Sequence, residues 1–153
     1  MSGKAMIQSS YFLATPLDTR ELGRRLGEQL AEGGGLMLVG GPLGAGKTTL
    51  VQGLAVGLGV DEPDEVRSAT FSLMDIHPGR TPLVHVDLYR IAESDELEVL
   101  DLPTWLDGGS VVAVEWPERA PELTSMARII IDLSEEAQGR RALVQEAVGA
   151  EHR

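Results

Sequence analysis

A glycine-rich loop between an apolar run and an amphipathic segment constrains this chain more than any other feature. Residues 41–48 read Gly-Pro-Leu-Gly-Ala-Gly-Lys-Thr and match the G-x-x-x-x-G-K-[ST] pattern. The apolar run at residues 36–39 is typical of a strand buried on both faces of a parallel sheet. Three leucines recur every fourth residue after the loop, which predicts a helix over residues 47–58 that Gly59 stops. A strand, this loop and a helix in that order predict an α/β fold of the P-loop NTPase kind.

The loop has the residues needed to hold nucleotide phosphates. Glycines such as Gly41 and Gly46 let the backbone curl so that successive N–H groups point at phosphate oxygens. Lys47, one of only two lysines in the chain, would reach the β- and γ-phosphates, and the Thr48 hydroxyl would face Mg²⁺. No Asn/Lys-x-x-Asp guanine motif is present, which favours ATP.

The rest of the chain alternates predicted strands and helices, which indicates a mostly parallel sheet with helices on both faces. Thr15 and Asp18 form a capping-box pattern around Pro16, so we expect a helix to begin there. We expect a single domain over residues 1–153, with 1–9 and 149–153 flexible. The other predicted elements are an edge strand at 11–14, strands at 71–76, 83–88, 111–115 and 127–133, a helix at 93–102 cut off by Pro103, and a C-terminal antiparallel hairpin that includes 140–148.

Two acidic residues stand at the ends of predicted buried strands. Asp87 follows one apolar strand, and Glu115 ends the apolar run at residues 111–115. An NTPase needs an acid near its phosphate loop to hold Mg²⁺ or to orient water. Because ligands bind at the carboxyl ends of the strands in α/β sheets, both acids are candidates. The spacing leaves open which of them contacts the metal directly.

Composition narrows the possible partners. The net charge is −11, from 24 acidic and 13 basic residues, so the chain has few cations to offer a nucleic-acid backbone. There are no cysteines, and no apolar run approaches the ~20 residues that cross a bilayer. We therefore expect a soluble, cytoplasmic protein that does not bind RNA tightly by itself. Residues 91–110 contain six carboxylates and no basic residue, which indicates either a solvated helix face or a docking surface for a basic partner.

The roles of several other side chains stay open at this point. Trp116 follows Glu115 directly and could stack on a base or pack in the interior. Arg90 and Arg119, each a few residues after a candidate acid, could neutralise phosphate charge or form ordinary ion pairs. The three histidines lack metal-ligand spacing, so we expect them to be ordinary surface or core residues.

Four segments, taken together, resemble one family. They are Gly-Pro-Leu-Gly-Ala-Gly-Lys-Thr-Thr at 41–49, Ser-Ala-Thr-Phe at 68–71, His-Val-Asp-Leu-Tyr-Arg at 85–90 and Glu-Trp-Pro-Glu at 115–118. Their order is similar to that in TsaE, the bacterial ATPase of tRNA threonylcarbamoyladenosine biosynthesis. The resemblance runs from about Thr15 to the C-terminal hairpin. The first segment is common to many families, whereas the last two are far more specific.

The resemblance implies both an activity and partners. The family's ATPase works with the subunits TsaB and TsaD, which attach the threonylcarbamoyl group to adenosine 37 of tRNAs reading ANN codons. ATP hydrolysis is expected to drive cycling of that complex, so tRNA would be contacted only indirectly and no membrane would be involved.

The resemblance also implies roles for individual residues. Thr48 and Glu115 would hold Mg²⁺, and Asp87 would lie near the metal and the γ-phosphate. Thr70 would belong to a switch-like loop that senses the nucleotide, and Thr15 would lie near the nucleotide. The residues it assigns to the phosphates are Gly44, Ala45, Gly46, Lys47, Thr48 and Thr49.

Two departures from the family pattern concern loop rigidity and hydrolysis rate. Pro42 stands where the family's loop usually has an acidic residue, and Ala69 stands where the switch usually has proline. Two other functions stay open at this point. A small-molecule kinase would need a basic lid, and residues 91–110 offer none. A nucleotide-gated binding module would bind ATP with only incidental hydrolysis.

Overall fold

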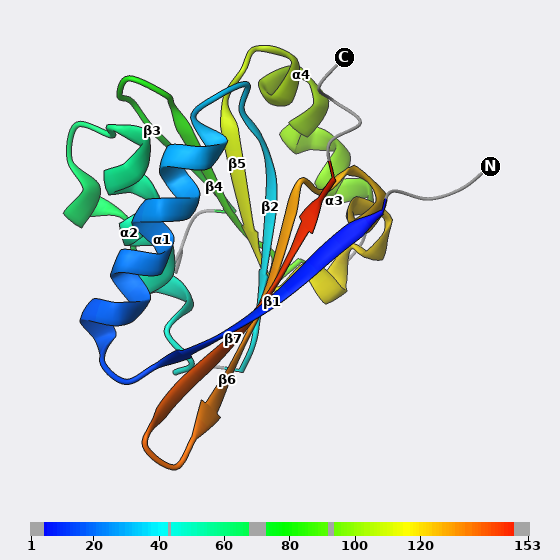
Figure 1. Cartoon of the computed structure of the whole chain (residues 1–153). Coiled ribbons are helices and arrows are strands. Elements are labelled where there is room, and N and C mark those ends of the chain that lie inside the picture. Colours follow the sequence, from blue (N-terminus) through cyan, green and yellow to red (C-terminus); the bar gives the residue numbers. More distant parts are fainter. Residues whose placement is uncertain (1–4, 43, 68–72, 92–93, 149–153) are drawn as a thin grey trace.

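The core of the molecule is a mixed β-sheet (Figure 1). The computed structural model describes residues 5–42, 44–67, 73–91 and 94–148, without the side chains of residues 94–96. Its strands are β1 (Met6–Leu13), β2 (Gly35–Gly40), β3 (Met74–His77), β4 (Leu83–Asp87), β5 (Val111–Glu115), β6 (Ile129–Glu136) and β7 (Gly139–Ala147). They lie side by side in the order β1-β7-β6-β2-β5-β4-β3.

The centre of the sheet is parallel and its two sides are antiparallel. Strands β6, β2, β5 and β4 form the parallel part. On one side β6 and β7 make the predicted C-terminal hairpin, whose tip extends beyond the rest of the sheet, and β1 adds to β7 as the edge strand (Figure 1). On the other side β3 pairs antiparallel with β4. The predicted α/β fold class and hairpin are confirmed, with the parallel pairing concentrated in the four central strands.

Helices cover both faces of this sheet. The helices are α1 (Pro16–Leu30), α2 (Lys47–Leu58), α3 (Ser94–Leu100) and α4 (Leu102–Asp107), with short 3-10 turns η1 (Pro63–Glu65), η2 (Pro117–Arg119) and η3 (Pro121–Met126). Along β5, Val111 and Ala113 pack with α1 and α2, whereas Val112 and Val114 pack with α3, α4 and η3. This alternation is the period of two expected for a strand buried on both faces. No helix in the described ranges is long and apolar enough to cross a membrane.

The first helix begins and packs as the sequence predicts. Thr15 and Asp18 form the reciprocal capping box, and Pro16 occupies the first helical position. The leucine face of α1 is buried. Glycines allow α1 and α2 to approach unusually closely, because a Cβ atom on Gly53 of α2 would lie 2.0 Å from the Arg20 carbonyl oxygen of α1.

Some boundaries differ from the predicted ones. Strand β1 begins at Met6, so it includes residues 6–9 that we expected to be flexible. The helix predicted at 93–102 is two helices, because Asp101 has a left-handed φ of 54° and separates α3 from α4. Pro103 lies in the first turn of α4, where a helix tolerates its missing N–H, so it helps to start a helix where we expected it to end one. Part of the strand predicted at 71–76 lies outside the described residues, and β3 continues to His77.

Candidate nucleotide site

A pocket of about 470 Å³ lies at the carboxyl ends of the parallel strands, beside the start of α2. This is the edge of an α/β sheet at which ligands bind. The lining residues come from α1, the glycine-rich loop, the first turn of α2, the ends of β4 and β5 with the residues that follow them, and the beginning of β7. They are Pro16, Thr19, Gly44, Gly46, Lys47, Thr48, Thr49, Asp87, Tyr89, Arg90, Glu115, Trp116 and Arg140.

The glycine-rich loop joins β2 to α2 through backbone conformations that favour glycine. Gly41 has a φ of 136°, and a Cβ atom there would lie 2.6 Å from the Leu133 carbonyl oxygen. Gly46 has a φ of 99° and is the N-cap of α2, with no side chain capping the helix. The N-terminal end of α2, which carries a partial positive charge, therefore faces the pocket at a residue that has no side chain of its own. Such a helix start attracts phosphate groups.

The Lys47 side chain is folded onto this loop. Its Nζ donates hydrogen bonds to the Gly41 and Pro42 carbonyl oxygens and lies 4.1 Å from the centre of the Trp116 ring. The residue is only 6% exposed. Burial lowers the pKa of Lys47, while the nearby carboxylates of Glu115, Glu118 and Asp87 act in the opposite direction. The Lys47 side chain is thus held against the loop inside the candidate phosphate site.

The two predicted acids come together at the floor of the pocket. Asp87 and Glu115 are directly paired across β4 and β5, and both are buried. The Tyr89 backbone N–H donates to Asp87 Oδ1 at 2.9 Å. Burial raises the pKa of Asp87, the Tyr89 hydrogen bond opposes this, and the Glu115 charge raises it further. Because the Glu115 charge disfavours a charged Asp87, a cation near both carboxyl groups would be favourable.

The donors in this pocket fit Mg²⁺ in the way that nucleotide-binding sites use it. Mg²⁺ prefers oxygen ligands and is usually held by one or two carboxylates together with substrate phosphates. Thr48, Asp87 and Glu115 supply a hydroxyl and two carboxylates to one pocket. Within the described ranges, no group of three or more His, Cys, Asp or Glu side chains could hold a metal by itself. A hydroxyl and two carboxylates are the kind of ligand set that binds Mg²⁺ together with substrate phosphates.

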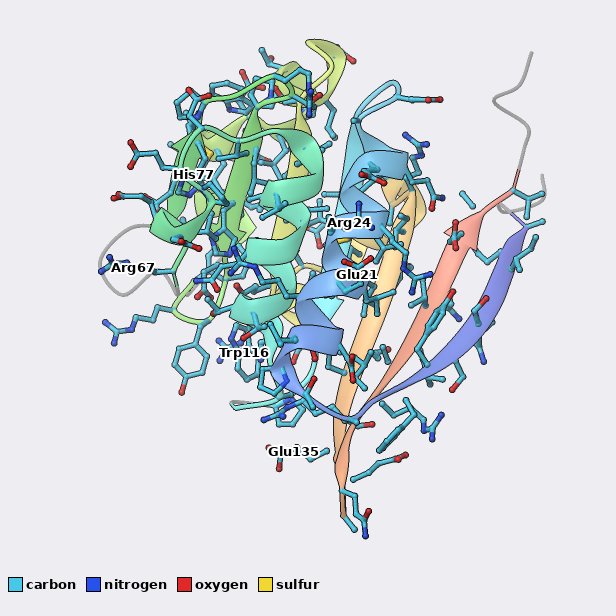
Figure 2. All side chains as sticks on the ribbon, turned by 60° about the vertical axis from the view of Figure 1, so that its left-hand side comes forward. Glu21, Arg24, Arg67, His77, Trp116 and Glu135 are labelled. Carbon is cyan, nitrogen blue, oxygen red and sulfur yellow. The ribbon has the colours of Figure 1, made fainter. Side chains whose placement is uncertain are left out.

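Trp116 follows Glu115 in a conformation that is rare for a tryptophan. Its φ is 59°, in the left-handed region, where residues other than glycine are strained. The ring packs against Tyr89, with centroids 5.0 Å apart, and against the Lys47 ammonium. Figure 2 shows Trp116 close to the beginning of α2. The strained backbone thus directs an aromatic ring to the wall of the pocket.

Most of the predicted site residues line this pocket. Ala45 is fully buried in the loop, and Gly41 forms its first turn. Thr15 is exposed and its hydroxyl accepts from the Asp18 N–H, while Pro16 and Thr19 of the same helix line the pocket. Thr70 and Ala69 lie outside the described residues. The predicted residues that do line the pocket are Gly44, Gly46, Lys47, Thr48, Thr49, Asp87, Glu115 and Trp116.

Arg140 is a pocket residue that the sequence did not single out. It lies at the start of β7, and its Nη2 donates to the Gly44 carbonyl oxygen at 2.8 Å. Thr19 and Tyr89 were missed as well. No local spacing announces Arg140, because the hairpin brings it to the loop from almost a hundred positions away.

Comparison with known proteins agrees with these observations. Residues 13–143 match the family model described as "Threonylcarbamoyl adenosine biosynthesis protein TsaE". The chain is 47% identical over 115 residues to a tRNA threonylcarbamoyladenosine biosynthesis protein TsaE of a Nostoc species, covering 72% of this chain and 68% of that one. It is 36% identical over 126 residues to the protein of the same name from Treponema pallidum, covering 82% and 91%.

The fold is also found among solved structures. The crystal structure of Bacillus subtilis YdiB superposes with a TM-score of 0.63 at 23% identity, covering 99% of this chain and 91% of that one. At this identity the likeness concerns the fold alone. The family is shown by the sequence matches, which extend over most of the chain. The chain therefore belongs to the TsaE family of tRNA threonylcarbamoyladenosine biosynthesis proteins.

Proposed function

We propose that this protein is a Mg²⁺-dependent ATPase that acts with TsaB and TsaD in the cytoplasm to threonylcarbamoylate adenosine 37 of tRNAs reading ANN codons. The observation that carries the proposal is the convergence of Lys47, Asp87 and Glu115 in one pocket beside the phosphate loop. A buried cation suits the phosphates, and the paired carboxylates suit a metal or a water molecule. Family membership supplies the pathway.

Each group has a distinct task in this proposal. The N–H groups at the start of α2 and the Lys47 ammonium bind the phosphates and hold them in line for attack. Thr48 and Glu115 would hold Mg²⁺, which would supply positive charge to the phosphates. Asp87, whose pKa is raised by burial, would accept a hydrogen bond from the attacking water. Trp116 shields the lysine side of the pocket.

The partners are proposed to complete a site that this chain leaves open. Tyr89 and Arg90 at the rim are exposed, so the described part of the pocket does not exclude water from the reaction. Slow hydrolysis by the protein alone, and faster hydrolysis with partners, follow from this. The net charge of −11 makes tight contact with tRNA unfavourable, so the proposed effect on tRNA is exerted through TsaB and TsaD.

The test is release of phosphate from ATP with and without Mg²⁺. Asp87→Asn and Glu115→Gln keep the size of the side chain and delete its charge. Each should slow Mg²⁺-dependent hydrolysis by roughly 100-fold, the scale of losing one transition-state contact, and affect ATP affinity much less. Asp107→Asn, at an exposed position on α4, is the matched control and should behave like the wild type.

Each other outcome points to a different function. Phosphate transfer to a small acceptor, without release into water, would identify a kinase. Binding of ATP without Mg²⁺-dependent turnover, even with both partners present, would identify a nucleotide-gated binding module. Normal turnover by Asp87→Asn or Glu115→Gln would make that residue merely structural.

A further inference from the structure

A polar side chain lies in the middle of the otherwise apolar strand β4. His85 is flanked by Val84 and Val86, and its side chain is fully buried. It lies opposite Ala113 in the parallel register, two residues before the Asp87–Glu115 pair. Since side chains at alternate positions share one face, His85 and Asp87 point to the same side of the sheet. That side is covered by α1 and α2, because Ala113 belongs to their core.

The histidine ring makes a direct contact with one of the proposed metal ligands. His85 Nε2 lies 2.7 Å from Glu115 Oε2, and the Glu115 side chain is only 3% exposed. The other ring nitrogen, Nδ1, is buried and has no hydrogen-bond partner among the residues that the structure describes. A neutral ring that carries its proton on Nε2 donates to the carboxylate and leaves only a bare acceptor at Nδ1. A proton on Nδ1 would place an unpaired N–H in the interior, which is less favourable.

We propose that His85 is a positioning residue for Glu115, holding one carboxylate oxygen through Nε2–H so that the other is directed into the nucleotide pocket. This inference rests on the proposed Mg²⁺-dependent function. Outer groups of this kind fix the orientation of a metal-binding side chain and tune its basicity. They matter most where a carboxylate must meet a small ion with strict geometry, as Mg²⁺ requires.

A purely structural role explains the pair less well. A buried polar pair in a sheet of valines and leucines contributes little net stability, since well-packed apolar residues of similar volume often serve as well or better. Strands β4 and β5 are otherwise apolar up to their terminal acids. A histidine at this position is understandable if it serves the acid beside it.

Variants of His85 and His77 test whether His85 positions Glu115 or has a purely structural role. His85→Leu removes the donor, whereas His85→Gln keeps an N–H donor near the same reach. His77→Gln is the matched control, because His77 also has a buried Nε2 without a partner in the described ranges but lies at the other end of the sheet from Trp116 (Figure 2). All three are made with Trp105→Phe, which leaves Trp116 as the only tryptophan to report on the pocket.

The main measurement is titration of Mg²⁺ into the ATP complex, followed by Trp116 fluorescence. We expect His85→Leu to weaken Mg²⁺ binding roughly 10- to 100-fold, with ATP affinity in EDTA unchanged, and His85→Gln to recover most of the loss. His77→Gln should match its parent. Wild-type Mg²⁺ affinity in a folded His85→Leu protein, or equal losses in the Leu and Gln variants, would overturn the role of His85.

A second measurement is made on the wild-type protein, so it does not depend on whether a variant folds. A long-range ¹H–¹⁵N spectrum of the imidazole rings should show the His85 proton on Nε2, and a proton on Nδ1 alone would overturn the proposal. The proposed function and the role of His85 can fail separately. Absence of Mg²⁺-dependent nucleotide binding in the wild type would overturn the proposed function and the role of His85 together. Failure of the variant tests alone would leave the ATPase standing.

Discussion

At the scale of single residues, the buried Lys47 side chain lies next to Trp116, whose backbone is in the left-handed region. Lys47 is buried against the loop carbonyls of Gly41 and Pro42, and Trp116 covers it from a strained backbone. Pro42, which departs from the family pattern, still provides its carbonyl oxygen to the lysine. The ammonium therefore has partners already, and it would exchange them for phosphate oxygens in the proposed nucleotide complex.

Replacing Lys47 by Ala should weaken ATP binding. The change removes a charge-assisted contact worth ~1.5–3 kcal/mol, or roughly ten- to a hundredfold in affinity. Isothermal titration calorimetry measures this directly. Arg24→Ala removes a cation on the surface of α1, where Arg24 pairs with Glu21 and Glu28, and should leave ATP affinity unchanged. Wild-type affinity in Lys47→Ala would remove Lys47 from the phosphate site.

His77 should make stability depend on pH. Burial lowers its pKa, and His85 lowers it further, while Asp75 and Glu65 oppose the shift. As the pH falls below about 6.5, the ordinary pKa of histidine, the unfolded chain takes up a proton that the folded protein resists. The free energy of unfolding therefore decreases as the pH falls from the ordinary pKa to the lowered pKa of His77. The contribution of His77 is fully present above the ordinary pKa.

Urea unfolding at pH 7.5 and pH 5.5 tests this point. The wild type should lose more stability than His77→Gln between the two pH values, because glutamine does not titrate. Equal losses in the two proteins would show that other groups cause the acid sensitivity of the fold.

At the scale of elements, short sequence patterns predicted the helices and strands that are determined by interactions between residues close in the chain. The capping box at Thr15 and Asp18, the helix after the phosphate loop and the buried central strands were all visible as short-range patterns. The extent of β1 was not, because its residues 8–10 are polar and are held by pairing with β7 at the far end of the chain. Arg140 reaches the pocket through the same long-range pairing. The spacing of residues along the sequence does not indicate the register of strands that are far apart in the chain. The place of Arg140 in the pocket could therefore not be predicted.

The packing of α1 on α2 should depend on glycine at the crossing. Gly53→Ala would place a methyl group 2.0 Å from the Arg20 carbonyl oxygen, which forces the helices apart. We expect a loss of ~1–3 kcal/mol in the free energy of unfolding. Helix propensity alone would favour alanine by ~1 kcal/mol, so the sign of the change is diagnostic.

Gly108→Ala serves as the control for this prediction. Gly108 has a φ of −79°, and the nearest atom to a Cβ there is 3.5 Å away, so the substitution should be tolerated. Chemical denaturation of both variants gives the comparison. Unchanged stability in Gly53→Ala would contradict the close approach of the two helices.

At the scale of the whole molecule, an acidic protein carries a small cationic site. The net charge is −11, yet Lys47, Arg90 and Arg140 line the same pocket. Such local concentration would allow an anionic nucleotide to bind where the overall field would repel it. The acidic segment that follows β4 remains a candidate surface for a basic partner, and Glu98, Asp101 and Asp107 within it are exposed. Glu93 and the side chain of Glu96 lie outside the described residues.

The most direct test of the account is the rate of ATP hydrolysis by the purified protein, measured alone and with a TsaB–TsaD pair from the same source. Lys47→Ala provides the background rate for each condition. We predict slow Mg²⁺-dependent turnover by the protein alone and a clear acceleration by the partners, because they complete a pocket whose rim is open. No acceleration, in a protein that still binds ATP and associates with both partners, would contradict the proposed role in tRNA modification.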